Sequence, residues 1–247
     1  MVDMKDLLNS PNANQPTQWP PAGVKWYFSD DSVAIAHADC REILPQLPKV
    51  DLVLTDPPYG LGLSMILNHG TLENTIHESS AWNEQIPDKE CFDLIYEKSK
   101  AQIIWGCNYF GSNIRDVGRI VHDKQLDIKG TKLRYSEADI ASCSLQKRVT
   151  IFRYRWNGNV QGNTINWQNI GPDARVHPTQ KPIALMSYCI LGYSKPEHLI
   201  LDCFMGSGTT LLSAKNLGRK AIGIEIEEKY CEIAAKRMSQ SVMELGI

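Results

Sequence analysis

The sequence Thr55-Asp56-Pro57-Pro58-Tyr59-Gly60 directly follows Val50-Asp51-Leu52-Val53-Leu54, an apolar run with the length of a buried strand. Two consecutive prolines neither extend a sheet nor open an ordinary helical turn, so they predict a stiff loop at the carboxyl end of that strand. Open α/β sheets place their ligands at this end of their strands. In an α/β fold, this loop would therefore place one carboxylate and one aromatic ring in a candidate ligand site.

This loop carries the groups that activate an aromatic amine. Asp56 and the carbonyl of Pro57 can both accept hydrogen bonds from one NH2 group, and Tyr59 can offer its face to a flat ring. An aromatic NH2 is a poor nucleophile because its lone pair is delocalised into the ring. Two acceptors around it favour a pyramidal nitrogen whose lone pair can attack. We predict Asp56, Pro57, Pro58 and Tyr59 as catalytic residues, and a proline-rich turn without chemistry is the alternative.

The composition is that of one globular chain. Of the 247 residues, 43% are hydrophobic and 22% are charged, and no apolar run approaches the length of about 18 residues that spans a membrane. We expect residues 1–20 to be a poorly ordered lead-in and residues 21–247 to form a single domain. The seven cysteines form no C-x-x-C pair, which favours buried thiols in a reduced, cytoplasmic protein over a metal site or disulfides.

A second ligand site is predicted at a glycine-rich turn. Leu199-Ile200-Leu201 is an apolar strand that runs into Asp202-Cys203-Phe204-Met205-Gly206-Ser207-Gly208-Thr209, after which a helix begins. The glycines remove side chains that would keep a ligand away from the backbone. Glu225 ends the next strand, 23 residues after Asp202, and an acid at a strand tip suits the two hydroxyls of a ribose. No Gly-Lys-Ser/Thr follows the turn, so it is not a P-loop.

Three motifs together resemble one enzyme family. Asp56-Pro57-Pro58-Tyr59 resembles the catalytic motif of the DNA amino-methyltransferases, chiefly the N6-adenine enzymes, and Asp202-x-Phe204-x-Gly206-x-Gly208-Thr209 resembles their S-adenosylmethionine motif. Arg175-Val176-His177-Pro178-Thr179-Gln180-Lys181-Pro182 resembles the segment that precedes the cofactor strand in these enzymes. The order of catalytic motif, basic segment and cofactor motif resembles the permuted β-group. The resemblance covers roughly residues 30 to 240.

The resemblance implies a three-layer α/β sandwich with a mostly parallel seven-stranded sheet and a small target-recognition insertion at about residues 125–174. It implies S-adenosylmethionine as the cofactor and no metal. Asp39 would lie near the cofactor's adenine, and the segment around Lys181 would hold its methionine end. The expected cofactor-binding residues are Asp39, Cys40, Asp56, His177, Thr179, Lys181, Asp202, Phe204, Met205, Gly206, Ser207, Gly208, Thr209 and Glu225.

A local basic segment compensates for the formal net charge of −2. Its side chains fit phosphate contacts, and aromatic residues lie between them, although a solvated strand face is the alternative. The predicted DNA-binding residues are Lys129, Lys132, Arg134, Lys147, Arg148, Arg153 and Arg155. The Asn- and Gln-rich residues 157–173 are a candidate for reading base edges, and residues 60–82 are a candidate lid. We expect double-stranded DNA as the partner, no membrane, and a monomer or homodimer.

Several further elements are predicted from pattern alone. Residues 87–101 are expected to form a helix and residues 102–106 a strand, and the alternation over residues 148–156 is typical of an antiparallel strand. After the strand at residues 102–106, Trp105 and Phe110 are expected to pack in the core. Asn108 and Tyr109 are expected to line a pocket for the target base.

The predicted function is transfer of a methyl group from S-adenosylmethionine to the N6 amine of adenine in a specific DNA sequence. An N4-cytosine methyltransferase is one alternative, although it usually has Ser in place of Asp56. A methyltransferase for protein glutamine or for RNA is another, with Asn typical at that position in the glutamine enzymes. A non-catalytic DNA-binding protein is the third, and the two intact motifs speak against it.

Overall fold

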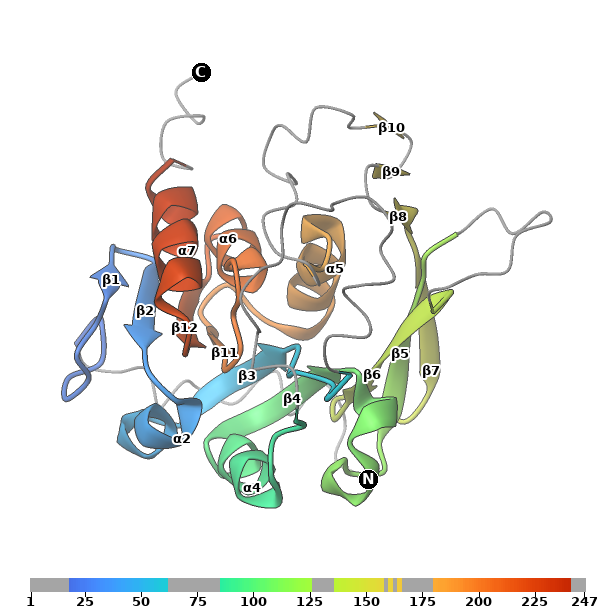
Figure 1. Cartoon of the computed structure of the whole chain (residues 1–247), viewed down its shortest axis with the longest axis horizontal. Helices are drawn as coiled ribbons and strands as arrows, with labels where there is room; N and C mark the ends of the chain where they lie inside the picture. Colours follow the sequence, from blue (N-terminus) through green and yellow to red (C-terminus); the bar gives the residue numbers. More distant parts are fainter. Residues whose placement is uncertain are drawn as a thin grey trace.

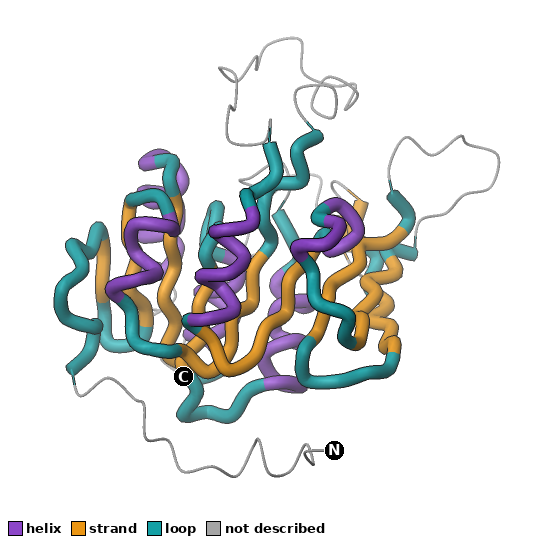
Figure 2. The backbone as a smooth tube through the Cα atoms, turned by 90° about the horizontal axis from the view of Figure 1, so that it is seen from below, coloured by secondary structure: helices purple, strands orange, loops and turns teal. Residues whose placement is uncertain are grey.

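The computed structural model describes residues 18–61, 85–125, 136–157, 160–161, 164–165 and 180–240. Within them, nine strands form one sheet in the order β1-β2-β12-β11-β3-β4-β6-β5-β7. These strands are β1 (Phe28–Ser29), β2 (Val33–His37), β3 (Val50–Thr55), β4 (Ser99–Trp105), β5 (Gly118–Asp123), β6 (Ala138–Cys143), β7 (Val149–Arg153), β11 (Leu199–Asp202) and β12 (Lys220–Glu225). Figure 2 shows the strands running side by side across the molecule.

Most strands of this sheet point in one direction. The pairs β2–β12, β12–β11, β11–β3, β3–β4 and β5–β7 are parallel, whereas β6 is antiparallel to both β4 and β5, and β1 is antiparallel to β2. Only β1 and β6 therefore run against the other seven in the described sheet. The carboxyl ends of those seven strands share one edge with the amino end of β6, and we call this edge the carboxyl edge.

Helices cover both faces of the sheet and form the outer layers. They are α2 (Cys40–Ile43), α4 (Lys89–Glu97), α5 (Ile183–Tyr193), α6 (Thr209–Asn216) and α7 (Glu228–Gln240). Figure 1 shows α5, α6 and α7 on one face, with α2 and α4 on the other. Each face has its own core cluster, because alternate strand residues such as Ile103 and Ile104 point to opposite faces. The three-layer arrangement expected from the sequence is therefore present.

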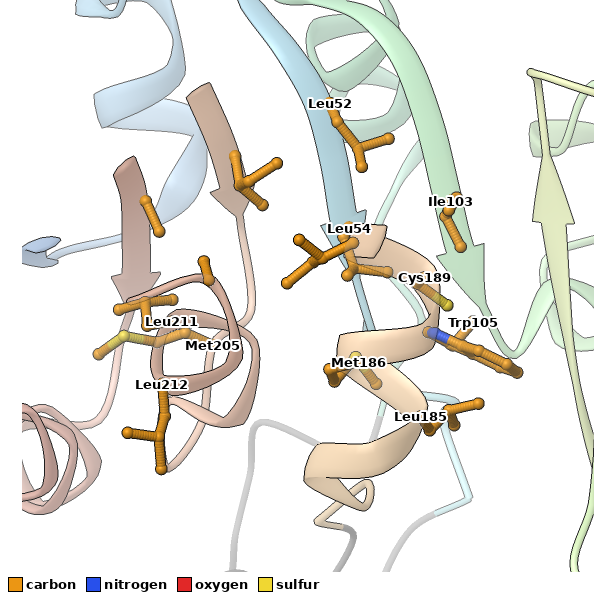
Figure 3. Close-up of a cluster of buried hydrophobic side chains, with 14 of the residues drawn as sticks. Leu52, Leu54, Ile103, Trp105, Leu185, Met186, Cys189, Met205, Leu211 and Leu212 are labelled. Carbon is orange, nitrogen blue, oxygen red and sulfur yellow. The ribbon is translucent and has the colours of Figure 1, made fainter. Parts of the chain in front are cut away.

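The face that carries α5 shows how these layers pack. Leu52, Leu54 and Ile103 point from β3 and β4 toward α5, where Met186 and Cys189 meet them (Figure 3). All five side chains are almost completely buried. Burial of apolar surface of this kind is the main force that holds a helix to a sheet.

Helix starts follow from local sequence. Asp39 caps α2 by accepting a hydrogen bond from the backbone N–H of Arg41, and Asp88 caps α4 in the same way through Cys91. Pro182 directly precedes α5, where its missing N–H costs nothing. The Asp39 cap starts α2 shortly after β2 ends at the carboxyl edge.

Three sequence expectations about these elements need correction, and one strand was not predicted. The sheet has nine strands in the described residues instead of seven. Strand β1 is added beside β2 at one end of the strand order, and the β5–β6–β7 group extends the other end beyond β4. β7 pairs parallel with β5, so its alternation reflects an exposed edge face and not an antiparallel neighbour. β6 was not predicted at all. The helix expected over residues 87–101 ends at Glu97, and β4 already begins at Ser99.

A second, three-stranded antiparallel sheet lies within the predicted insertion. It consists of β8 (Trp156–Asn157), β9 (Val160–Gln161) and β10 (Thr164–Ile165) in the order β10-β9-β8. Figure 1 places these short strands next to one end of β7. Most of the expected lead-in, the candidate lid and part of the Asn- and Gln-rich segment lie outside the described residues.

Three general features accompany this fold. All seven cysteines are buried, as expected, and none forms a disulfide. No helix in the described part of the chain is long and apolar enough to span a membrane. In the same residues, no group of three or more His, Cys, Asp and Glu side chains is arranged to hold a metal ion.

Candidate active site

The two predicted ligand sites meet at the carboxyl edge. Asp56 follows β3, while Asp202 ends β11 and Glu225 ends β12. Thr55 at the end of β3 donates a hydrogen bond from its hydroxyl to Asp202 Oδ1 at 2.7 Å, across 147 residues of sequence. The Asp-Pro-Pro-Tyr loop and the glycine-rich turn therefore form one continuous site.

Asp56 is held by two neighbours in this site. The hydroxyl of Tyr59 donates to Asp56 Oδ1, and the ammonium of Lys181 donates to Asp56 Oδ2 at 2.7 Å. Lys181 also donates to the Tyr59 hydroxyl at 3.1 Å. Between Asp56 and Tyr59, Pro57 is buried and Pro58 is half-buried, and the two stiff residues fix this loop. Asp56, Tyr59 and Lys181 thus form a hydrogen-bonded cluster, here called the loop triad.

Burial and charge together set the protonation of this triad. Burial and the carboxylate of Asp56 raise the pKa of Tyr59 well above its usual value, so the phenol keeps its proton and donates it. Burial alone would lower the pKa of Lys181, but Asp56, Tyr59 and Asp139 raise it well above the usual range. The Lys181 side chain is only 9% exposed, so its positive charge is held among these groups.

The ring of Tyr59 lies in an aromatic cluster at the end of β4. It stacks on Tyr109 with ring centroids 4.7 Å apart and planes 15° from parallel, and it meets Phe110 edge-on at 6.0 Å. Gly106 provides the space for this ring, because a Cβ there would lie 2.0 Å from Tyr59 Cε1. Trp105 and Phe110 are buried in the core, as predicted.

A hollow beside this ring opens at the carboxyl edge. Tyr59, Asn108, Tyr109 and Asp139 contribute to its lining, and we call it the base hollow. Asn108 and Tyr109 were expected to line a pocket for the target base; both line this hollow, and its binding of a base stays a prediction. Asp139 was not expected there, because its position depends on strand β6.

A second hollow lies on the other side of the triad and is called the cofactor hollow. Asp56, Lys181 and Asp202 line it together with residues of the glycine-rich turn, including Met205, Gly206, Ser207 and Thr209. Gly206 and Gly208 have φ angles of +51° and +80°, a backbone region that favours glycine. The turn leads directly into α6 at Thr209, which confirms the predicted start of that helix.

Two acids fix the glycine-rich turn. Asp202 Oδ1 accepts a hydrogen bond from the backbone N–H of Phe204 at 3.2 Å, and burial raises the pKa of Asp202 to about 6. Glu225 accepts from the N–H of Gly206 at 2.9 Å and from the N–H of Glu227 at 2.8 Å, and burial raises its pKa as well. Hydrogen bonds from Thr55 and from the N–H of Phe204 oppose this effect of burial and favour the ionised carboxylate of Asp202.

Asp39 and Cys40 lie after β2 and have structural partners. Asp39 accepts hydrogen bonds from Arg41, which lower the pKa of the Asp39 carboxyl, and Arg41 also pairs with Asp88 at 3.0 Å. Cys40 is buried with its sulfur 3.5 Å from that of Cys91. Neither residue lines the cofactor hollow, so their contact with a cofactor stays a prediction.

The remaining predicted cofactor residues differ in position. Met205 is buried and packs over Gly223, where a Cβ would lie 2.4 Å from the Met205 sulfur, while Phe204 packs on the opposite core cluster. His177 and Thr179 lie outside the described residues. Lys181 lines the cofactor hollow, but its ammonium is directed to Asp56.

Sequence reasoning missed two residues that hold the turn. Arg237 of α7 donates to the Ser207 carbonyl at 2.6 Å, and Gln180 accepts from the Ser207 hydroxyl at 3.3 Å. Gln180 belongs to the segment that suggested Lys181, so that motif gave a signal. Arg237 lies in an amphipathic helix, and nothing in its local sequence distinguishes it from a solvated arginine.

The basic residues do not all share one face. Arg153 and Arg155 are exposed at the carboxyl end of β7, on the carboxyl edge, whereas Lys147 and Arg148 are exposed just before β7 begins, at the opposite edge. Arg153 is the last residue of β7, so the length of this strand lies between the two pairs. Lys129, Lys132 and Arg134 lie outside the described residues. Of the four predicted DNA-binding residues that the structure describes, Arg153 and Arg155 lie at the edge that carries the site, and Lys147 and Arg148 do not.

A family model described as DNA methylase, N6_N4_Mtase, matches residues 86–236, which is more than half of the chain. The chain belongs to this family. In this DNA methylase the matched segment begins after the Asp-Pro-Pro-Tyr loop and includes the glycine-rich turn and Glu225. The loop, which the family match leaves out, is joined to the turn by the hydrogen bond from Thr55 to Asp202.

Similar proteins cover most of the methylase. It is 28% identical to Type II methyltransferase M.HinfI of Haemophilus influenzae, over 88% of this chain and 71% of that protein. It is 26% identical to Type II methyltransferase M2.LlaDCHI of Lactococcus lactis subsp. cremoris, over 87% and 93% respectively. It is also 26% identical to DNA adenine methyltransferase YhdJ of Escherichia coli strain K12, over 85% and 84%.

Two solved structures share the fold of the methylase. The complex of M1.HpyAVI with SAM superimposes with a TM-score of 0.54 at 27% identity, covering 83% of this chain and 99% of that one. The PvuII DNA methyltransferase, named as cytosine-N4-specific, superimposes with a TM-score of 0.58 at 17% identity and covers 91% of each chain. The second likeness concerns the fold alone.

Proposed function

We propose that this chain transfers a methyl group from S-adenosylmethionine to the N6 amine of adenine within a specific DNA sequence. The observation that carries the proposal is the hydrogen bond between Thr55 and Asp202, which joins the amine-activating loop to the glycine-rich turn in one site. An acid at position 56 and the adenine methyltransferase among the relatives favour adenine over cytosine. The order of the motifs along the chain supports the β-group arrangement.

The cofactor hollow has groups suited to S-adenosylmethionine. Gly206 and Gly208 leave the backbone free of side chains, and the ionised Asp202 offers a partner for a positively charged group. Ser207 and Thr209 line this hollow and would border the methionine end. Glu225 does not line the hollow, but it holds the N–H of Gly206 beside it and would bind the ribose hydroxyls. When bound, S-adenosylmethionine supplies an electrophilic methyl group on a positively charged sulfur.

The chain's own task is to hold and activate the amine. Asp56 and the Pro57 carbonyl would accept the two N–H bonds of the target amine, which directs its lone pair outward. The methylated nitrogen must lose one proton, and the carboxylate of Asp56 is the base placed to receive it. No covalent enzyme intermediate is required, and the buried thiols are not needed for the reaction.

The target base has to leave the DNA helix to reach Asp56. Flipping costs a few kcal/mol of lost stacking and pairing, and stacking on an aromatic side chain returns about 1–3 kcal/mol. The base hollow, with Tyr59, Tyr109 and Asn108 in its lining, is the place where such a base would be received. Strands β8–β10 and the segment around them would form the target-recognition region.

The decisive experiment is incubation of the purified chain with labelled S-adenosylmethionine and genomic DNA, followed by nucleoside analysis. N6-methyladenine is the expected product, and sequencing of the modified sites then gives the recognised sequence. N4-methylcytosine would identify the cytosine alternative. Label on RNA or protein but not on DNA would contradict the proposal, as would binding to DNA with no label transferred.

We expect Glu225→Ala to weaken S-adenosylmethionine binding by about 1–3 kcal/mol, because a charged hydrogen-bond acceptor is lost. Calorimetric titration measures this change directly. Glu232→Ala is the matched control, since Glu232 is an exposed acid on α7 that pairs with Lys236 at 2.7 Å. Equal affinity of Glu225→Ala and the wild type would remove Glu225 from the cofactor site.

Among the basic residues, we expect only those on the carboxyl edge to contact DNA. Arg155→Ala and Arg153→Ala should weaken binding to all sequences alike and lower the slope of log affinity against log salt by about one each. Lys147→Ala is the control, because Lys147 lies at the opposite edge. A smaller slope for Lys147→Ala than for Arg155→Ala would reverse this placement.

A further inference from the structure

The loop triad stands between the two hollows. Tyr59 borders the base hollow, while Asp56 and Lys181 border the cofactor hollow. Under the proposed function, the amine and the methyl group approach each other from these two sides. Any rearrangement that admits the amine must therefore take place within this triad.

Both oxygens of Asp56 already have a donor. The Tyr59 hydroxyl donates to Oδ1, and Lys181 donates to Oδ2 at 2.7 Å. The amine of a target base needs an oxygen of this same carboxylate. The ammonium is the stronger competitor, because it carries a full charge that is almost completely removed from water. Lys181 has to loosen its hold on Asp56 for the amine to bind well.

Asp139 provides a second place for the ammonium. Its Oδ2 lies 4.0 Å from Lys181 Nζ, on the side of the base hollow. A movement of about 1 Å would bring this distance into the range of a charge-assisted hydrogen bond. The Asp139 carboxylate is itself fixed, since Lys124 pairs with Oδ1 at 2.8 Å and His122 lies 3.6 Å from Oδ2.

Asp139 is also charged under working conditions. Burial alone would raise the pKa of its carboxyl, but Lys181, His122 and Lys124 together lower that pKa well below the usual range. An ionised carboxylate is what a buried ammonium requires of a new partner. Without one, a Lys181 that leaves Asp56 would be a buried charge with no counter-ion, which is strongly unfavourable.

We propose that Asp139 is a positioning residue for methyl transfer, which takes over Lys181 when the target amine binds Asp56. The ammonium then moves between two carboxylates and never leaves its counter-ions. Asp139 touches neither the amine nor the methyl group in this role and acts only through Lys181. This inference rests on the proposed function.

The test uses Asp139→Asn, which keeps the shape and removes the charge. We expect the single-turnover rate of methyl transfer to fall about tenfold or more, the scale of one lost charged hydrogen bond. Affinities for S-adenosylmethionine and for DNA should stay within about twofold of wild type, a small change in binding free energy. Asp139→Glu keeps the charge and should retain most of the rate, even if Asp139→Asn proves poorly folded.

The decisive comparison is made in the Lys181→Gln background. Because Asp139 acts through Lys181, adding Asp139→Asn to Lys181→Gln should change the rate little, whatever the rate of Lys181→Gln alone. An equal loss in both backgrounds would overturn the proposal. A wild-type rate for Asp139→Asn in the native background would overturn it as well.

Asp51→Asn is the control for a merely structural effect. Asp51 is a buried acid that pairs with Lys100 at 2.7 Å near the opposite end of β3. Both Asn variants should lose thermal stability, but only Asp139→Asn should lose transfer rate in its folded fraction. A parallel loss of rate and stability in the two variants would make Asp139 a structural residue only.

A binding measurement without cofactor gives a second readout. The wild type should bind DNA with adenine at the target position more tightly than DNA with purine, which lacks the amine. In Asp139→Asn this preference should shrink, because Lys181 stays on Asp56, and an undiminished preference would contradict the proposal. If the wild type methylates no DNA at all, the proposed function has failed before the question of Asp139 arises.

Discussion

Asp56→Ala is expected to lower the rate of methyl transfer by at least about a hundredfold to a thousandfold, the scale for loss of one preorganised electrostatic partner of a transition state. The carboxylate is the acceptor for the target amine and the base for its proton, and alanine does neither. S-adenosylmethionine affinity should change much less, because the other residues that line the cofactor hollow keep their side chains. Single-turnover transfer and calorimetric titration measure the two effects separately.

Two further variants make this result interpretable. Asp56→Asn keeps the size of the side chain and one acceptor oxygen, so it tests the charge with less disturbance of Lys181. Asp93→Ala removes an exposed acid that pairs with Lys89 at 2.5 Å on α4, and it should leave transfer unchanged. Near-normal turnover of Asp56→Ala on DNA would show that the amine is activated elsewhere.

Gly106→Ala is expected to have the second-largest effect, through the position of Tyr59. The new Cβ would lie 2.0 Å from Tyr59 Cε1, so the ring has to leave its place on Tyr109. The Tyr59 hydroxyl then moves away from Asp56. We expect transfer to fall at least about tenfold, and overpacking to lower the free energy of unfolding by about 1–3 kcal/mol.

The control for Gly106→Ala is Gly111→Ala. Both glycines have positive φ angles, +71° and +52°, but a Cβ at Gly111 meets nothing within 4 Å. Gly111→Ala therefore carries only the backbone strain, about 1–2 kcal/mol, and should keep its transfer rate. In a Tyr59→Ala background, Gly106→Ala should lose the part of its effect that comes from the clash and keep only the backbone strain. If both alanine variants reduce transfer equally, the clash with Tyr59 is not the cause.

The sequence predicted those parts of the site whose chemistry is local. The two prolines after β3 and the glycines after β11 require particular backbone shapes, and Asp56, Asp202 and Glu225 follow at strand ends. A short apolar run that ends in an acidic residue can be recognised as a strand with an acid at its end without any knowledge of the neighbouring strands. For that reason the common edge of these residues was predicted correctly.

The missed parts depend on pairing between distant strands. Asp139 looked like a stray acid in a basic segment, because only the register of β6, with Asp139 opposite His122, brings it to Lys181. Lys147 and Arg148 looked like neighbours of Arg153 and Arg155 for a similar reason. Counting charges along a strand takes no account of its length, and β7 carries its two ends to opposite edges.

The hydrogen bond from Thr55 to Asp202 has a consequence for how the two ligands bind. A cofactor that orders Asp202 also orders the strand end from which the Asp-Pro-Pro-Tyr loop departs, so the second ligand finds part of its site already arranged. Thermodynamic linkage makes such help mutual: DNA must tighten cofactor binding by the same factor by which the cofactor tightens DNA binding. The buried hydroxyl of Thr55 thus couples the affinity for the cofactor to the affinity for DNA, so that neither changes without the other.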